Sequence, residues 1–234
     1  MSIARRKLLQ RGLSLGALTL LTGCYLSDND AVQSVLARFS TWNDRVQAAL
    51  FRGQQLAPTF PESMAVKDFR YNAWYSRDKA PRLDPADYRL LLSGKIADKR
   101  PWTVAELHAL PQATQITRHV CVEGWSAIGS WQGVKLSDFL KLIGADLTAK
   151  YVWFQCAEGY SNTIDMPTAL HPQTQLTLKF DHQILPRAYG FPIKIRIPTK
   201  LGFKNPKYVT AMWVQNNDAG GYWENQGYNW FSGL

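Results

Sequence analysis

The segment TQITRHVCVEGW, residues 114–125, predicts the architecture of this chain most directly. From Thr114 to Val122 polar and apolar residues alternate, which is typical of a β-strand with one buried face. Because side chains on a strand repeat every second residue, Thr117, His119 and Cys121 should share one face. We therefore expect a strand that carries an imidazole and a thiol side by side.

The segments around this strand alternate between short helices and short strands. Apolar residues spaced three and four apart predict a helix over residues 30–51, and Thr103 with Glu106 forms a capping box that begins another. The remaining predicted elements are a helix at 137–143 and strands at 88–96, 151–156, 176–180, 183–185, 193–197 and 208–214. The chain has no repeat and no GxGxxG after a strand. This pattern predicts a single β-rich, mixed α+β domain rather than a doubly wound sheet.

The N-terminal segment is typical of an export signal. Its apolar run, residues 12–22, is far below the ~20 residues that span a bilayer. The pair Arg5-Arg6 is of the twin-arginine type, which marks export of folded proteins. Residues 21–24, LTGC, look like a lipobox, in which Cys24 would be lipidated. The alternative is a signal cut elsewhere, with Cys24 unmodified.

These features predict three parts of the chain: a signal at 1–23, an N-terminal helix and loop at 24–67, and the main domain at 68–234. They also predict a periplasmic location, with or without a lipid tether at Cys24.

The net charge of +9 is concentrated in two places. Removing the four basic residues of the signal from the 27 leaves 23 basic against 18 acidic residues, a net of +5. No acid lies between Asp181 and Asp218, a stretch with six basic residues: Arg187, Lys194, Arg196, Lys200, Lys204 and Lys207. Lys194 and Arg196 alternate with isoleucines, which predicts a half-buried strand with a cationic outer face. This local positive field favours a defined anionic ligand over nucleic acid.

Cys121 is the strongest candidate for chemistry. A lone cysteine in a strand is often a small buried hydrophobe, and a disulfide with Cys156 is a second alternative in an oxidising compartment. Against both, Arg118, His119 and Glu123 lie within a few positions of Cys121. A thiolate near Arg118 would have a lowered pKa and would be a good soft metal ligand. Zinc and serine-hydrolase sites are weakly supported, because the chain lacks CxxC, HExxH and a complete nucleophile elbow.

Several motifs together resemble one enzyme family. RHVCVEGW at 118–125 resembles the molybdenum-ligating segment of the sulfite oxidase superfamily of molybdopterin enzymes, closest to its methionine-sulfoxide reductase branch. YNAWY at 71–75, AKYVWF at 149–154 and the run from Leu185 to Lys204 resemble further segments of that branch in the same order. The resemblance covers about residues 68–215 and implies an α+β fold of the sulfite oxidase molybdopterin-binding type.

The resemblance also implies a molybdenum-molybdopterin cofactor, with the Cys121 thiolate as the protein's metal ligand. It places cofactor contacts in two segments, at Asn72, Tyr75 and Ser76 and at Asn205, Pro206 and Lys207. In the second segment, backbone N–H groups and Lys207 would hold the terminal phosphate of the pterin.

At three more contact positions the chain departs from the family pattern. Cys156 replaces a threonine, Tyr189 replaces an asparagine or histidine, and Lys194 replaces an arginine. Lys194 keeps the positive charge but loses the bidentate fork. If Cys156 lies beside the cofactor, the disulfide alternative is weakened.

Three other residues have both a functional and an ordinary interpretation. Lys200 and Lys204 could help to bind the cofactor, or they could form a solvated face of the loop. Glu123 could carry a proton beside Cys121 on the same strand face, or it could be a surface carboxylate.

The resemblance implies an exported, molybdopterin-dependent oxidoreductase that performs a two-electron oxygen-atom transfer or a related redox reaction on a small-molecule substrate. The glycine-asparagine-arginine-arginine segment of sulfite oxidases is absent after Cys121, which argues against sulfite. The short turn at 157–161 replaces a longer insertion of the sulfoxide reductase, which argues against methionine sulfoxide.

No haem-binding signature is present, so electrons should pass to or from a separate partner, a membrane cytochrome or a cytochrome c. The competing interpretation is a non-catalytic periplasmic lipoprotein that binds an anionic ligand through its basic loop.

Overall fold

A computed structural model describes residues 30–51 and 53–234. The predicted export signal and Cys24 therefore lie outside the described residues. By their internal contacts the described residues divide between Arg45 and Val46 into two compact units, and the family-like motifs all lie in the second, which extends to Leu234. The predicted domain boundary at 67/68 stays a prediction.

Helix α2, Asp30–Leu50, confirms the first predicted helix. None of its residues is buried, and Phe39 and Trp42 are 65% and 63% exposed. Within the described ranges, no helix combines the length and apolarity needed to cross a membrane.

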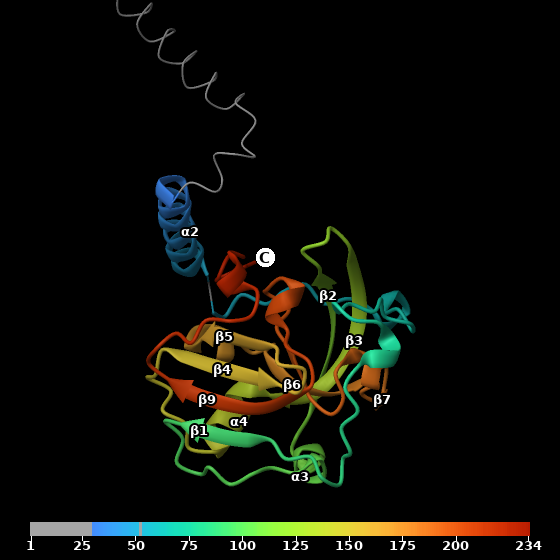
Figure 1. The fold of residues 1–234 in the computed structure, drawn as a ribbon. Helices are drawn as coiled ribbons and strands as arrows, with labels where there is room; N and C mark the ends of the chain where they lie inside the picture. The colour runs from blue at the N-terminus through green and yellow to red at the C-terminus, as the bar shows by residue number, and fades with distance from the viewer. Residues whose placement is uncertain (1–29, 52) are drawn as a thin grey trace, which may run out of the picture. The chain divides into compact units, whose positions relative to one another are not determined.

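Two sheets build the second unit (Figure 1). The first has the order β1-β9-β4-β5, in which β1 runs parallel to β9 and the other pairs are antiparallel. Its strands are β1 (Leu91–Gly94), β9 (Val209–Gln215), β4 (Tyr151–Cys156) and β5 (Ser161–Asp165). The second sheet has the order β2-β3-β6-β7, and β8 also pairs with β6. Its strands are β2 (Ala113–Val120), β3 (Ser126–Lys135), β6 (Gln175–Phe180), β7 (Gln183–Ile184) and β8 (Lys194–Arg196).

Short helices connect the strands. The α-helices are α3 (Val104–Ala109), α4 (Leu136–Leu142) and α5 (Met166–Ala169), and the 3-10 turns are η1 (Glu62–Met64), η2 (Arg77–Lys79), η3 (Arg187–Tyr189), η4 (Gly202–Lys204) and η5 (Glu224–Gln226). The predicted capping box is confirmed at α3, where Glu106 N donates to Thr103 Oγ1 at 3.2 Å and Thr103 N donates to Glu106 Oε2 at 2.8 Å. The mixed α+β fold class is therefore confirmed.

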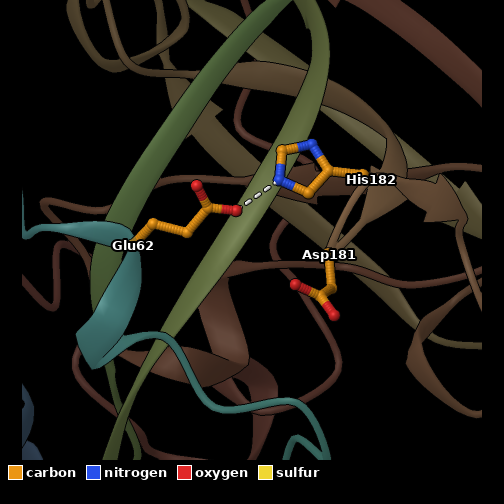
Figure 2. A group of neighbouring side chains, drawn as sticks. All are labelled: Glu62, Asp181 and His182. Atoms are coloured by element: carbon orange, nitrogen blue, oxygen red, sulfur yellow. Dashed lines mark hydrogen bonds and ion pairs between the residues drawn. The ribbon is translucent and has the colours of Figure 1, made fainter.

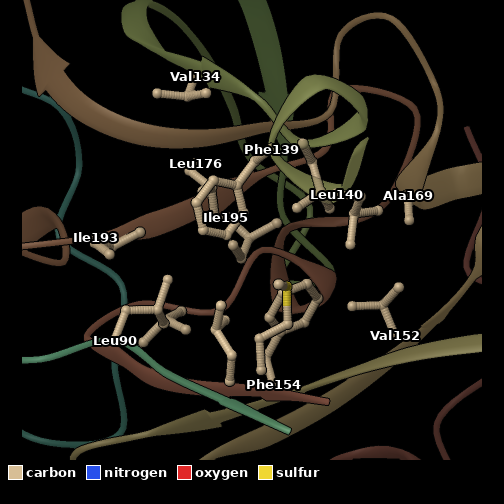
Figure 3. Close-up of a cluster of buried hydrophobic side chains, with 14 of the residues drawn as sticks. Leu90, Val134, Phe139, Leu140, Val152, Phe154, Ala169, Leu176, Ile193 and Ile195 are labelled. Carbon is tan, nitrogen blue, oxygen red and sulfur yellow. The ribbon is translucent and has the colours of Figure 1, made fainter. Parts of the chain in front are cut away.

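One hydrophobic core joins the two sheets (Figure 3). Val152 and Phe154 of β4 meet Leu176 of β6 and Ile195 of β8, and Phe139 of α4 closes the cluster. All five are fully buried. Burying each such side chain is worth roughly 1.5–3 kcal/mol. The core therefore fixes how β8 and its basic residues lie against the rest of the unit.

The structure corrects the prediction of a half-buried β8 with a cationic outer face. Lys194 and Arg196 are 5% and 0% exposed, so both faces of the strand are buried. Their charged groups lie over the ring of Trp131 in β3, at 4.8 and 5.9 Å from its centroid. The sequence analysis did not predict β3, so it could not show that Trp131 of β3 covers Lys194 and Arg196.

Candidate functional site

The thiol of Cys121 lies just beyond the end of β2. Thr117, His119 and Cys121 are 0%, 3% and 4% exposed, which confirms the predicted shared face. The chain leaves the strand at Val120 and turns back, with Cys121 N donating to Trp125 O at 2.9 Å. Cys121 is not in a disulfide, and Asn72 Nδ2 donates to its Sγ at 3.2 Å. A side-chain amide thus fixes the sulfur at the end of the strand.

The expected activation of Cys121 by Arg118 is wrong. Arg118 is exposed on the opposite face of β2, where its guanidinium lies 5.3 Å from the ring of Phe60. Burial raises the pKa of Cys121 above its ordinary value, and only weaker contributions from hydrogen bonds and Arg70 lower it. The protein alone therefore holds a thiol, and metal binding would have to displace its proton.

A cavity of about 200 Å³ lies beside this turn. Its lining includes six residues that the sequence predicts for the site: Asn72, Tyr75, Glu123, Asn205, Pro206 and Lys207. A smaller cavity of about 40 Å³ shares Asn72, Asn205 and Lys207 and adds Tyr189, Lys194 and His119. The fold therefore brings together residues that are up to 135 positions apart in the sequence.

Ser76 and Cys156 do not line either cavity. Ser76 is exposed at the start of η2. Cys156 is 3% exposed and packs in the main hydrophobic core, where burial raises its pKa well above its ordinary value. A disulfide between Cys121 and Cys156 does not occur, since both are free thiols.

A larger cavity of about 330 Å³ lies elsewhere in the second unit. It is lined mainly by apolar residues, and Arg118 is the one charged residue among them. This cavity lacks the clustered polar groups that orient a reacting ligand. The smaller pair of cavities is the better candidate for chemistry.

Three cations crowd the candidate site. Burial lowers the pKa of Lys207 to about 8 and that of Arg196 to about 9. Burial, together with the charges of Lys207 and Arg196, lowers the pKa of Lys194 well below its ordinary value. In the described part of the chain, no carboxylate forms an ion pair with any of the three. Such a cluster fits an anionic ligand.

The Asn205 side chain holds the loop that follows β8. Its Oδ1 accepts from Arg196 Nη1 at 2.9 Å and from Ile197 N at 2.7 Å, and its Nδ2 donates to Leu201 O at 3.1 Å. Lys207 Nζ, at the end of the loop, donates to Asn72 O at 2.6 Å. This bond joins the loop to the segment whose amide contacts Cys121.

His119 is a site residue whose state the sequence does not reveal. Burial and the charges of Lys194, Arg196 and Lys207 lower its pKa well below the ordinary value, so the ring is neutral. Its Nδ1 is buried and has no hydrogen-bond partner within the described residues. Gly202 leaves space for the ring, because a Cβ there would lie 2.5 Å from His119 Nε2. A bound ligand could use the unpaired nitrogen.

Lys200 and Lys204 do not serve the cavity as predicted, and they are not solvated either. They are 2% and 1% exposed. The Lys204 ammonium pairs with Glu224 and donates to Thr163 O at 2.7 Å, while that of Lys200 lies over the ring of Phe231. Both lysines therefore have internal partners, which the basic pattern alone could not show.

Glu123 lies in the turn after β2 and not on the strand face, because the strand ends at Val120. Its carboxylate is exposed and accepts from Trp125 Nε1 at 2.8 Å. A different carboxyl, Glu158 in the turn between β4 and β5, lines the same cavity; the residue is partly buried and its Oε2 is buried. Burial raises the pKa of Glu158 to about 7. Apart from the shortness of its turn, no sequence pattern pointed to Glu158 as a site residue.

A second group of ligand-type side chains lies away from the cavities. Glu62, Asp181 and His182 offer atoms within 4.8 Å of one another (Figure 2). His182 Nε2 lies 2.6 Å from Glu62 Oε1, and Lys67 Nζ lies 2.8 Å from Asp181 Oδ1. Because an ammonium already neutralises Asp181 and the group is mostly exposed, we assign it no metal.

Known proteins resemble this chain over most of its length. A family model described as oxidoreductase molybdopterin binding domain matches residues 77–223. A protein of Azospira oryzae, provisionally named protein-methionine-sulfoxide reductase subunit YedZ1, is 58% identical over 230 residues, which are 98% of this chain and 88% of that protein.

The protein-methionine-sulfoxide reductase catalytic subunit MsrP of Burkholderia mallei is 29% identical over 150 residues, which are 57% of this chain and 45% of MsrP. Among solved structures, the sulfane dehydrogenase SoxCD from Paracoccus pantotrophus has a similar fold, with a TM-score of 0.56 and 19% identity over 60% of this chain and 41% of its own.

Proposed function

Because the chain belongs to the family of oxidoreductase molybdopterin-binding domains and is a molybdenum cofactor-dependent oxidoreductase, we propose that it reduces methionine sulfoxide in proteins to methionine. The observation that carries this proposal is the 58% identity to the Azospira protein over 98% of the chain. In the reaction the S–O bond breaks, the sulfur gains two electrons, and the oxygen leaves as water with two protons.

The substrate proposal revises one expectation from the sequence. The short turn at 157–161 differs from the longer sulfoxide reductase, which argued against methionine sulfoxide. The Azospira relative is named as a sulfoxide reductase subunit, and 88% of its length aligns with this chain. That relative is therefore not a much longer protein, and the short turn does not by itself argue against methionine sulfoxide. The non-catalytic lipoprotein interpretation does not hold, because the family is one of oxidoreductases.

The residues of the two cavities fit the cofactor. A buried, neutral His119 with a free nitrogen, and Lys194 and Lys207, which form no ion pair within the described residues, offer hydrogen bonds and positive charge to an anionic pterin phosphate. The Cys121 sulfur would ligate the metal, held in place by the Asn72 amide. When bound, the cofactor supplies two-electron redox chemistry that no side chain of the protein provides.

The remaining proposals concern the protein's surroundings. We infer from the twin-arginine pair and the lipobox that the protein is exported to the periplasm, with Cys24 as a lipid anchor. Two electrons per turnover would come from a separate haem-type donor, a membrane cytochrome or a cytochrome c.

The test is metal analysis combined with turnover. Protein purified from a molybdenum-replete host should contain nearly one molybdenum per chain and should reduce a methionine-sulfoxide peptide with a reduced viologen dye as electron donor. Cys121→Ser should abolish turnover, because oxygen is a poor substitute for the soft sulfur ligand. Cys156→Ser is the matched control and should keep turnover. A folded wild-type protein without molybdenum, or one that is loaded and leaves the peptide unreduced, would contradict the proposal.

A further inference from the structure

Glu158 is a partly buried residue whose Oε2 is buried, and it lines the cavity without a role among the proposed cofactor contacts. It lies in the tight turn between β4 and β5, where Gly159 N donates to Cys156 O at 3.2 Å and Cys156 N donates to Tyr160 O at 2.9 Å. Gly159 has a φ of +84°, a conformation that glycine adopts without strain. The turn therefore aims a carboxyl into the cavity from a rigid hairpin.

The surroundings of Glu158 disfavour its charged form. Its Oε2 is buried and has no hydrogen-bond partner in the part of the chain that the structure describes. The side chains of Trp74, Tyr75, Tyr160 and Trp223 line the same cavity and make its wall largely aromatic. An unpaired carboxylate in such a place costs several kcal/mol, whereas the protonated acid costs much less.

The groups that face Glu158 come from three parts of the fold. Tyr71 and Tyr75 lie on the segment before η2, Cys156 and Tyr160 lie on its own hairpin, and Lys207 and Tyr208 lie on the loop before β9. Glu123 lines the same cavity from the turn after β2.

Of these groups, only Lys207 and the residue's own backbone N–H favour the carboxylate, and burial outweighs both, so that the pKa is about 7. An anionic ligand on Lys207 would weaken its effect and raise the pKa of Glu158 further.

We propose that Glu158, and not Glu123, donates a proton to the oxygen that leaves the sulfoxide. The step rests on the proposed function. The molybdenum cofactor would supply two-electron redox chemistry when bound, with a haem-type donor as the source of the electrons. In the overall reaction the S–O bond breaks, sulfur keeps the bonding electron pair, and the oxygen takes up two electrons and two protons and leaves as water. One proton comes from the Glu158 carboxyl, which solvent then reprotonates, and the second comes from solvent. Glu123, by contrast, is exposed in the turn after β2, and its carboxylate already accepts a hydrogen bond from Trp125 Nε1.

The test compares the pH dependence of kcat/KM in Glu158→Gln and Glu123→Gln, both of which remove a carboxyl with little change in shape. Wild-type turnover of the methionine-sulfoxide peptide should fall as the pH rises through about 7 or somewhat above, because the acid must be protonated. Glu158→Gln should keep its molybdenum, lose about 10²–10⁴-fold in kcat/KM and lose this pH dependence. Glu123→Gln should keep the pH dependence of the wild type.

The outcomes separate the two proposals. If the molybdenum-loaded wild type shows no turnover, the proposed function is contradicted, but the protonation of Glu158 is not. Turnover with the same pH dependence in Glu158→Gln overturns the present inference alone.

A second measurement applies even if Glu158→Gln loses the cofactor. The infrared difference spectrum of cofactor-free wild type minus Glu158→Gln should show a protonated-carboxyl band at pH 5 that disappears by pH 9. Absence of this band at pH 5 overturns the inference, since the carboxyl would then hold no proton to donate.

Discussion

Helix α2 and the basic segment, residues 194–207, reverse the usual relation between polarity and burial. In α2, Phe39 and Trp42 are mostly exposed, while in the basic segment Lys194 and Arg196 are buried. An exposed aromatic side chain contributes little to folding, whereas a buried cation has a large desolvation cost. We therefore expect the binding of an anionic ligand to change the free energy of folding through the basic segment, and we expect no such effect from α2.

The largest expected effect is at Arg196. Its guanidinium donates to Asn205 Oδ1 at 2.9 Å, to Arg118 O at 2.6 Å and to Thr117 Oγ1 at 3.2 Å. In Arg196→Met, Thr117 Oγ1 and Arg118 O lose this donor, while Asn205 Oδ1 keeps its bond from Ile197 N. The free energy of unfolding should therefore fall by about 2–4 kcal/mol, at about 1–3 kcal/mol for each unsatisfied group less the relieved desolvation. Urea denaturation measures the change. Substitutions at surface positions usually change the free energy of unfolding by less than about 0.5 kcal/mol. A loss of that size in Arg196→Met would mean that the guanidinium does not hold the loop.

The next effect is the pH dependence of the cofactor-free protein. The pKa of Glu158 is about 7 in the folded protein and near 4.5 when unfolded, so its contribution to stability is fully present below pH 4.5 and is lost as the pH rises through about 7. The loss should be at most about 3 kcal/mol, since each pKa unit corresponds to about 1.4 kcal/mol. Glu158→Gln should lack it. Identical pH profiles of stability in the two proteins would show that the carboxyl is not protonated in the folded state.

A smaller effect, of opposite sign, is expected at Lys194. Its ammonium is buried against Trp131 and is repelled by Lys207 and Arg196. Lys194→Met should therefore stabilise the cofactor-free protein by about 1–2 kcal/mol and lower its molybdenum content, a trade between stability and binding. Thermal unfolding and metal analysis of the same sample test both parts. If Lys194→Met destabilises the protein as Arg196→Met does, the two cations have the same structural role.

The smallest effect is expected in α2. Phe39→Ser and Trp42→Ser should each change the free energy of unfolding by less than about 0.5 kcal/mol, because neither side chain is buried. Phe139→Ala in the core, where Phe139 is fully buried, is the control and should cost about 3–5 kcal/mol. A loss above about 1 kcal/mol in either α2 variant would show that the helix is covered in solution.

The sequence analysis correctly predicted elements whose structure depends mainly on neighbouring residues. The capping box of α3, the bounds of β4 and the two strands on either side of Asp181 and His182 all depend on residues close together in the sequence, and the structure confirms them. Strand β3 was not predicted, because SAIGSWQGVK has no alternation and pairs only by virtue of β2 and β6 on either side. Gly133 of β3 leaves no space for a Cβ beside Leu176 O, a constraint that only the paired strand reveals.

The candidate site divides in the same way. The face shared by His119 and Cys121 follows from strand periodicity, and the structure confirms it. The burial of Lys194, the free nitrogen of His119 and the raised pKa of Glu158 depend on elements distant in sequence. The sequence therefore located the basic residues, but it could not show what surrounds them.

The three hydrogen bonds of the Asn205 amide have a consequence for the order of assembly. They shape the loop from within the chain, so like charges are held close together before any ligand arrives. Insertion of the cofactor would then relieve electrostatic repulsion and would order little backbone. We therefore expect the binding site to be preformed before the cofactor enters. Such a protein can take up its cofactor after folding and can then be exported in the folded, cofactor-bound state.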